Sequence, residues 1–436
     1  MNVIFVLIVL CAFLFAGWRQ VFLVSMQDVP SPMEILSKAM ITSAGGAVEL
    51  AIGLVGVMAL FLGLMKVAEA GGMLTILARL IRPLMVKLFP DVPADHPAMG
   101  AMILNLSANV LGLGNAATPF GIRAMQELDK LNPQRGTATD AMALFLAINT
   151  SSVTLLPSGV IALRAAAGSS DPAAILPTTL FATIGSTTIA VVAAKLYQRL
   201  MPLRVGAEAS IEQVPLDDGE VVYSNDGKEV PSNDTAKGYP LWVSIMALSF
   251  LVLLMPVCVI YGRSISPWII PVLMVGFLGF GLVRRVRVYE VFVEGAKDGF
   301  RVALRIIPYL VAILVAVDML RASGALEAMV GLLSGITGPL GLPAEALPMA
   351  MMRPLSGSGA YGILASIIND PAIGPDSYTG YLVSTLQGST ETTFYVLAVY
   401  FGSVQVRRIR HSLAAGLTAD IAGVIFAVLA CSFFLG

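Results

Sequence analysis

Residues 105–119 read NLSANVLGLGNAATP, which is the strongest local signal in the first half of the chain. Amides are expensive facing lipid, and glycine and proline weaken or interrupt a helix. An interrupted helix at membrane depth is tolerated only inside protein or beside water, where its free backbone groups bind solutes. We therefore predict a solute-lining role for its polar side chains, which are Asn105, Ser107, Asn109 and Asn115. The alternative is interhelical hydrogen bonding with close glycine packing.

The rest of the chain has the composition of a membrane protein. Of its 436 residues, 57% are hydrophobic and 13% are charged, which is about half the ~25% charge typical of soluble domains. This excludes a soluble enzyme and a disordered scaffold, and the net charge of −1 excludes a bulk field that attracts nucleic acid. The predicted fold class is an all-α polytopic membrane protein in a lipid bilayer, with roughly 8–10 spans plus interfacial amphipathic helices.

The apolar runs place the individual spans. Segments 33–44 and 289–301 mix apolar and charged residues and suit interfacial helices. The predicted spans are 3–24, 46–66, 140–164, 174–197, 241–261, 267–283, 302–321, 378–402 and 412–435.

A charged segment divides the chain into two halves. Residues 198–238 hold twelve charged residues, eight of them acidic, among turn-forming pairs, which indicates a solvated linker. The halves 1–197 and 266–436 share one order of amphipathic segment, span, Pro/Gly loop and polar small-residue stretch. Because secondary transporters often contain such repeats, we predict two related helical repeats with interrupted or re-entrant helices. Residues 239–265 are an extra transmembrane span, which we expect to set the orientation of the second half relative to the first.

The second half has its own polar stretch. Residues 353–362 read RPLSGSGAYG, which combines helix breakers with Ser356, Ser358 and an arginine. A guanidinium stays charged at any working pH, so a buried Arg353 needs a carboxylate, a ring of carbonyls or an anionic ligand. We predict that Arg353, Ser356 and Ser358 contact the solute. The alternative for Arg353 is a structural pair or an interfacial snorkel.

Polar residues also interrupt two apolar spans at mid-length, 140–164 and 378–402. A carboxylate deep in a bundle is either paired or protonated, so Glu391 pairs with Arg353, carries a coupling proton or binds a cation such as sodium. The residues predicted to contact the solute here are Asn149, Ser151, Gln387, Ser389, Thr390 and Glu391.

Enzymatic and metal-binding motifs are weak or missing. Ser358 lies between glycines without the full serine-hydrolase elbow, and no phosphate loop or zinc motif appears. The chain has two histidines, and its three cysteines lie in apolar runs. We therefore predict a non-enzyme with no cofactor and no metal.

Long motifs resemble a known group of membrane proteins. Residues 63–71, 89–93, 105–119 and 149–151 resemble the spore maturation protein A family. Residues 288–297, 353–359, 374–377 and 387–395 resemble the spore maturation protein B family. Both belong to the nucleoside-recognition, or Gate, domain family, so the chain is similar to a fusion of the two. The resemblance implies a multi-pass bacterial inner-membrane protein with broken helices and a transport role, whose two halves work as a one-to-one unit.

The leading hypothesis is therefore a transporter or channel for a small polar, anionic or zwitterionic solute, with proton or sodium coupling. The alternative is a non-transporting membrane scaffold for envelope or spore assembly, with the acidic linker as its docking segment. The oligomeric state, including a homo-oligomer, stays open.

Overall fold

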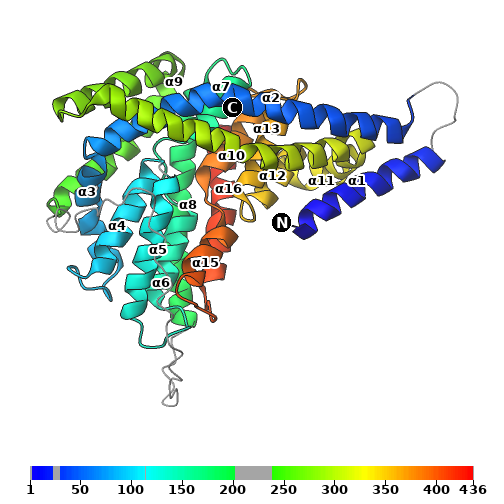
Figure 1. The fold of residues 1–436 in the computed structure, drawn as a ribbon. Coiled ribbons are helices and arrows are strands. Elements are labelled where there is room, and N and C mark those ends of the chain that lie inside the picture. Colours follow the sequence, from blue (N-terminus) through cyan, green and yellow to red (C-terminus); the bar gives the residue numbers. More distant parts are fainter. Residues whose placement is uncertain (1, 23–29, 113, 202–237, 436) are drawn as a thin grey trace.

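The computed structural model describes residues 2–22, 30–112, 114–201 and 238–435, which fold almost entirely into α-helices (Figure 1). Strand-like pairing in this part of the chain is limited to an isolated bridge between Thr137 and Arg408. The predicted all-α class is confirmed. The helices of the first half are α1 (Asn2–Phe22), α2 (Pro32–Ala70), α3 (Met73–Leu88), α4 (Pro97–Val110), α5 (Gly114–Lys130), α6 (Asp140–Thr150), α7 (Ser158–Ala166) and α8 (Ile175–Leu200).

The second half repeats this order. A long helix pair, a broken hairpin, a broken span and a closing helix follow one another in each half. The helices are α9 (Leu241–Val283), α10 (Val288–Ser323), α11 (Ala325–Thr337), α12 (Leu347–Met352), α13 (Gly357–Ile368), α14 (Tyr378–Ser389), α15 (Thr393–Gly402) and α16 (Ser412–Leu435). Single 3-10 turns occupy Pro172–Ala174, Gly338–Leu340 and Ala344–Ala346.

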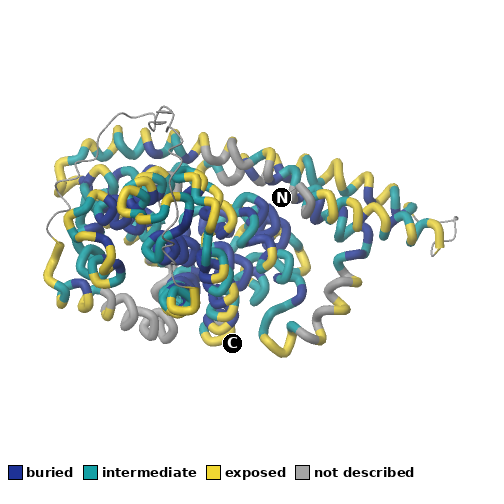
Figure 2. The backbone as a smooth tube through the Cα atoms, turned by 90° about the horizontal axis from the view of Figure 1, so that it is seen from below, coloured by how far each residue is buried: buried dark blue, intermediate teal, exposed yellow. Residues whose placement is uncertain are grey.

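Contacts between the halves follow an approximate two-fold pattern. α2 packs along α10, and α8 packs along α16. α1 contacts α10 while its counterpart α9 contacts α2, and the broken helices α6 and α14 each contact both α8 and α16. In Figure 1, α2, α9 and α10 run across one end of the bundle formed by α4, α5, α6, α8 and α16. Figure 2 shows buried residues concentrated in that bundle, with exposed residues along the long helices.

The interfacial segments are not separate helices. Segment 33–44 continues without a break into the span that follows it, within α2, and segment 289–301 does the same within α10. A capping box of Ser31 and Glu34 starts α2, and Gly45 and Gly46 remain helical because no proline interrupts the backbone hydrogen bonds there. These two boundaries were predicted wrongly, since a change of polarity does not end a helix.

The spans predicted at 241–261 and 267–283 are also continuous, as the single helix α9. At 1.5 Å per residue, its 43 residues extend about 65 Å, roughly twice the ~30 Å hydrocarbon core. The polar residues between the two runs lower local hydropathy but do not end the helix. The orienting role of residues 239–265 stays a prediction.

The described residues contain three helices that are long and apolar enough to cross a bilayer, or up to four spans if a bent pair counts as one. In the described part of the chain they are Phe5–Phe22, Pro172–Leu200 and Ser412–Phe434, plus the pair Val55–Ala70 and Met73–Leu88, bent by 70°. The predicted spans 140–164 and 378–402 are instead two broken helices, α6–α7 and α14–α15. Interrupted helices are therefore confirmed, and they position the polar residues.

Candidate functional site

The two broken helices meet at their breaks. α6 ends at Thr150 and α14 ends at Ser389, and a non-helical segment precedes the next helix in each case. The segment after α14 is extended at Thr390 and Thr392. The backbone N–H of Glu391 donates to the carbonyl oxygen of Thr150 over 2.8 Å, which joins the break of the second half to that of the first.

Each break is also tied to the hairpin of its own half. The N–H of Leu155 donates to the carbonyl of Val110 at the end of α4, over 2.9 Å. In the second half, the N–H of Phe394 donates to the carbonyl of Pro354, just after α12, over 3.1 Å. The polar stretches predicted separately from the sequence therefore lie together in space, in equivalent arrangements.

The asparagines form one hydrogen-bonded group. The Nδ2 of Asn109 donates to Oδ1 of Asn149 over 3.0 Å. The Nδ2 of Asn105 donates to the carbonyl of Ala117 over 2.7 Å and to the hydroxyl of Tyr400 over 3.1 Å. The interhelical bonds foreseen as the alternative are thus present. Tyr400 was not predicted, because an aromatic residue in an apolar span gives no signal of a polar partner 295 residues away.

Arg353 lies against the second break. Its Nη1 donates to Oγ1 of Thr392 over 3.1 Å, and its Nη2 donates to the carbonyl oxygen of Thr390. Nη2 also lies 3.7 Å from Oε2 of Glu391. The guanidinium side chain is 7% exposed but the Glu391 side chain is 50% exposed. The structural pair that was the alternative for Arg353 is therefore present. It is a long ion pair in which the Glu391 side chain is half exposed.

Four predicted hydroxyls bond within their own helices. Ser107 donates to Ile103, Ser151 to Ala147 and Ser389 to Leu386. Ser356 caps α13 by accepting the N–H of Gly359 over 3.0 Å. Ser358 lies with its hydroxyl 3.4 Å from that of Ser356, and the side chain of Asn115 lies outside the described residues.

Three predicted residues keep a buried polar atom without a hydrogen-bond partner. These atoms are Oδ1 of Asn105, Nε of Arg353 and Oε1 of Gln387. Buried polar groups are normally satisfied, so each such atom needs an explanation. A bound polar solute or water would supply the missing partners.

An ion pair that joins the two halves was not predicted. Arg164 on α7 is fully buried, and its Nη2 lies 3.0 Å from Oδ1 of Asp376 in the loop before α14. Burial alone would raise the pKa of Asp376, but hydrogen bonds from Ser169 and Ser170 and the nearby guanidinium outweigh it and hold the pKa below its usual range. The pair could not be predicted from the residues near Arg164, because its partner Asp376 lies 212 residues away in the chain.

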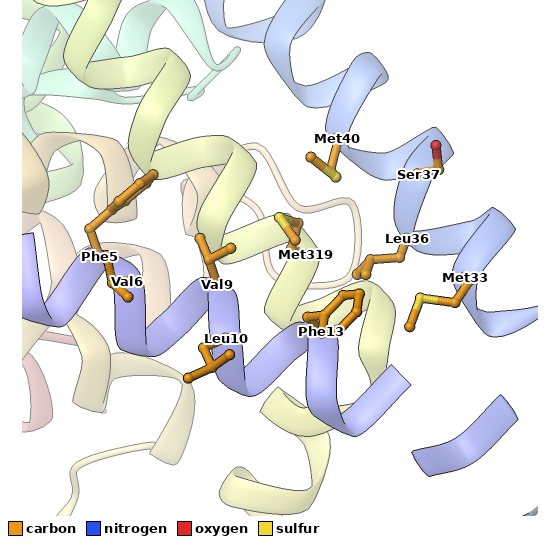
Figure 3. A pocket seen from close by; sticks show the side chains of 10 residues that line it. All are labelled: Phe5, Val6, Val9, Leu10, Phe13, Met33, Leu36, Ser37, Met40 and Met319. Carbon is orange, nitrogen blue, oxygen red and sulfur yellow. The ribbon is translucent and has the colours of Figure 1, made fainter. Parts of the chain in front are cut away.

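A cavity of about 530 Å³ lies elsewhere, between α1, α2 and α10 (Figure 3). Except for Ser37, the residues that line it are apolar, and it contains none of the predicted site residues. Its chemistry suits a hydrocarbon chain rather than a polar solute. In the described part of the chain, no cluster of three or more His, Cys, Asp or Glu side chains could hold a metal ion.

The membrane-type helices, paired breaks and duplicated order agree with comparisons to known proteins. Residues 51–199 and 303–407 match the family described as Gate, nucleoside recognition. The chain belongs to the Gate family. It is 44% identical over 167 residues to spore maturation protein B of Bacillus subtilis (strain 168), covering 38% of this chain and 93% of that protein. It is also 47% identical over 152 residues to spore maturation protein A of the same organism, covering 35% of this chain and 78% of that protein. No solved structure matches the chain.

The two relatives match different parts of the chain, as a fusion requires, so the resemblance to both families is confirmed. The Gate family is a transporter-like membrane family and not an enzyme family. A membrane protein of transporter type follows from this membership and from the apolar helices. The solute-binding role of the individual residues stays a prediction.

Proposed function

We propose that this protein is a multi-pass transporter or channel of the bacterial inner membrane, and that its solute binds where the breaks of α6 and α14 meet. One observation carries the proposal. The Glu391–Thr150 backbone bond brings the two breaks together, beside buried side chains that keep unpartnered polar atoms. Non-helical backbone at membrane depth is tolerated only where it is buried in protein or lines a cavity, and transporter sites use such discontinuous helices.

The side chains around the breaks favour a small polar solute with a negatively charged group. Arg353 supplies a permanent positive charge with an unpartnered Nε, and guanidinium matches carboxylate geometry. Gln387 on α14 and Asn105 on α4 keep unpartnered amide oxygens, which bond neutral polar donors. Glu391, half exposed beside Arg353, would add a site for an ammonium group, which together suits an anionic or zwitterionic solute.

The test is uptake by purified protein in liposomes, with a panel of radiolabelled amino acids, dicarboxylates and nucleosides. Hydrogen bonds to charged groups contribute about 1.5–3 kcal/mol, so we expect Arg353→Ala and Glu391→Gln each to lower uptake of the transported solute about 10- to 100-fold. Asp95→Asn is the matched control, since the Asp95 side chain is 96% exposed and lies in the loop between α3 and α4. Unchanged uptake in both site variants would remove the site.

A membrane scaffold remains the second candidate, because of the eight acidic residues in the linker 198–238. Most of this segment lies outside the described residues. Deletion of residues 206–236, with all helices retained, separates the two functions. Transport should largely survive the deletion, whereas a scaffold that docks through its acidic segment should lose its partner. Proton or sodium coupling and assembly as a homo-oligomer are further proposals.

A further inference from the structure

α16 carries a single acidic residue, Asp420, in the middle of its apolar sequence. This residue is 5% exposed. Its Oδ2 accepts a hydrogen bond from Oγ1 of Thr393 over 2.7 Å, but its buried Oδ1 has no hydrogen-bond partner. An isolated ionised carboxylate is very costly to bury, so the free oxygen indicates a site that a cation or a proton completes.

Two glycines let α16 approach the second break closely. Gly416 and Gly423 lie about one turn on either side of Asp420. A Cβ at Gly416 would lie 2.8 Å from Cγ2 of Thr393, and a Cβ at Gly423 would lie 2.4 Å from Cγ2 of Thr390. The carboxylate is therefore held against the extended segment between α14 and α15.

The hydroxyls around these glycines present acceptor lone pairs. A Cβ at Gly416 would lie 3.8 Å from Oγ1 of Thr150, and a Cβ at Gly423 would lie 3.9 Å from Oγ of Ser389 and 3.8 Å from Cβ of Ser186. Each donates its own proton to a carbonyl in its helix: Thr150 to Ala147, Ser186 to Thr183 and Ser389 to Leu386. With their protons used in this way, the oxygens are available to a cation and do not serve as donors to Asp420.

The dipoles of two helices also favour a cation beside Asp420. α6 ends at Thr150 and α14 ends at Ser389, both beside this face of α16. The C-terminal end of a helix carries partial negative charge, and such ends of interrupted helices coordinate Na⁺ or H⁺ in transporters. Two converging negative ends beside a carboxylate favour a bound positive charge.

The helices that pack against α16, which are α6, α8, α14 and α15, bring little positive charge to Asp420. Arg353 acts on it electrostatically, but the ion pair of Arg353 is with Glu391. On α6, Asp140 is the first residue and pairs with Arg410. The other titratable or charged groups on the packed helices are Lys195, Tyr197 and Arg199 in the last turns of α8, Tyr378 and Tyr381 on α14, Tyr395 and Tyr400 on α15, and Cys431 on α16 itself.

We propose that Asp420, Thr393 and the oxygens of the adjoining breaks form a binding site for one monovalent cation, either a proton or a sodium ion. Glu391 is less suited to this role, because it is half exposed and already lies beside a guanidinium. The bound cation neutralises the carboxylate where the two halves meet. Its role as a coupling ion rests on the proposed transport function, whereas its binding does not.

The test uses the full chain in detergent and measures the midpoint of thermal unfolding in NaCl against choline chloride at equal ionic strength. For sodium, we expect the midpoint to rise by several degrees at saturation, and the rise to be lost in Asp420→Asn but kept in Asp95→Asn. For a proton, we expect no sodium effect but an infrared C=O band of a protonated carboxyl group at neutral pH, absent in Asp420→Asn. The proposal is overturned if the unfolding midpoint shows no Asp420-dependent sodium shift and the infrared spectrum shows no Asp420-dependent carboxyl band.

A second variant keeps the test decisive if Asp420→Asn fails to fold. Thr393→Val removes the one hydroxyl bonded to the carboxylate and keeps the side-chain shape. In the sodium case it should raise the half-saturating concentration several-fold, and in the proton case it should shift the frequency of the carboxyl band. If neither the half-saturating sodium concentration nor the frequency of the carboxyl band differs from wild type, the Thr393–Asp420 hydrogen bond is not part of the site. Because no flux is measured, a protein that binds the cation but moves no solute would retain this inference and lose the proposed function.

Discussion

At the residue scale, the contact between the first hairpin and the first broken helix depends on Gly112. Its φ is 77°, and a Cβ built there would lie 2.3 Å from the carbonyl oxygen of Leu156. Glycine is therefore required twice, for the left-handed conformation and for the close approach. Gly168 has the same φ, but a Cβ there would meet nothing within 4 Å.

This pair of glycines gives a controlled prediction. A left-handed conformation costs an L-residue about 1–2 kcal/mol, so Gly168→Ala should lower stability by about that amount. Gly112→Ala should cost more, because backbone must also move to relieve the clash. Thermal unfolding of the two purified variants measures the difference. Equal losses would show that the close approach to Leu156 contributes nothing.

At the element scale, α2 and α10 pack through small residues. A Cβ at Gly299 would lie 2.6 Å from Cα of Ala59, and a Cβ at Gly63 would lie 2.9 Å from the carbonyl oxygen of Phe292. Small residues at such crossings let helix backbones approach closely in membranes. The α2–α10 contact joins the two halves along most of their long helices.

We expect Gly299→Ala to lower the thermal midpoint, because the added methyl group meets backbone and forces the helices apart, at a cost of about 1–3 kcal/mol. Gly276→Ala on α9 is the control, since a Cβ there meets nothing within 4 Å. That control should be neutral or slightly stabilising, because alanine favours helix over glycine by about 1 kcal/mol. A midpoint for Gly299→Ala at or above that of wild type would contradict the packing.

The elements also show which features were predictable from sequence. The break between α4 and α5 was predictable, because glycines there stand beside amides that lipid does not tolerate. Pro119 was expected to add to this break but lies inside α5. The breaks within 140–164 and 378–402 were not foreseen, since both segments were predicted as spans. The continuity of α2, α9 and α10 was not, because polarity marks the surroundings of a helix and not its ends. Asp420 was overlooked inside an apolar span, since its hydroxyl neighbours and the two glycines acquire meaning only when α16 lies against the break.

At the scale of the whole molecule, the Arg164–Asp376 pair links the first half to the second outside the breaks. Because the folded-state pKa of Asp376 is lowered, its contribution to stability is present above the unfolded pKa of about 3.9. That contribution is lost as the pH falls through the folded pKa. The link between halves should therefore weaken only in acid.

Accordingly, Asp376→Asn should lower the midpoint of unfolding at pH 7, and its difference from wild type should shrink as the pH falls below about 4. Unfolding series from pH 7 to pH 3 check this, with Asp95→Asn as a control in which the exposed carboxylate contributes little. A difference that grows in acid would mean that the carboxylate is not stabilised by its partners.

The proposed solute site lies between the two halves, where their breaks meet. Protection of an introduced cysteine by the solute tests this position, in a protein whose three native cysteines are replaced by serine. Ser358→Cys is nearly isosteric and half-buried, and Ser358 lies in the first turn of α13 with its hydroxyl 3.4 Å from that of Ser356. The adjacent Gly357 faces the second break, since a Cβ there would lie 2.9 Å from Oγ1 of Thr392. Asp95→Cys, at the exposed hairpin loop, serves as the control.

A charged methanethiosulfonate reagent should modify both introduced thiols. The solute that wild-type protein transports should slow the reaction of Ser358→Cys and leave that of Asp95→Cys unchanged. If saturating solute leaves both reaction rates unchanged, while the Ser358→Cys protein still transports it, the site does not lie between the breaks.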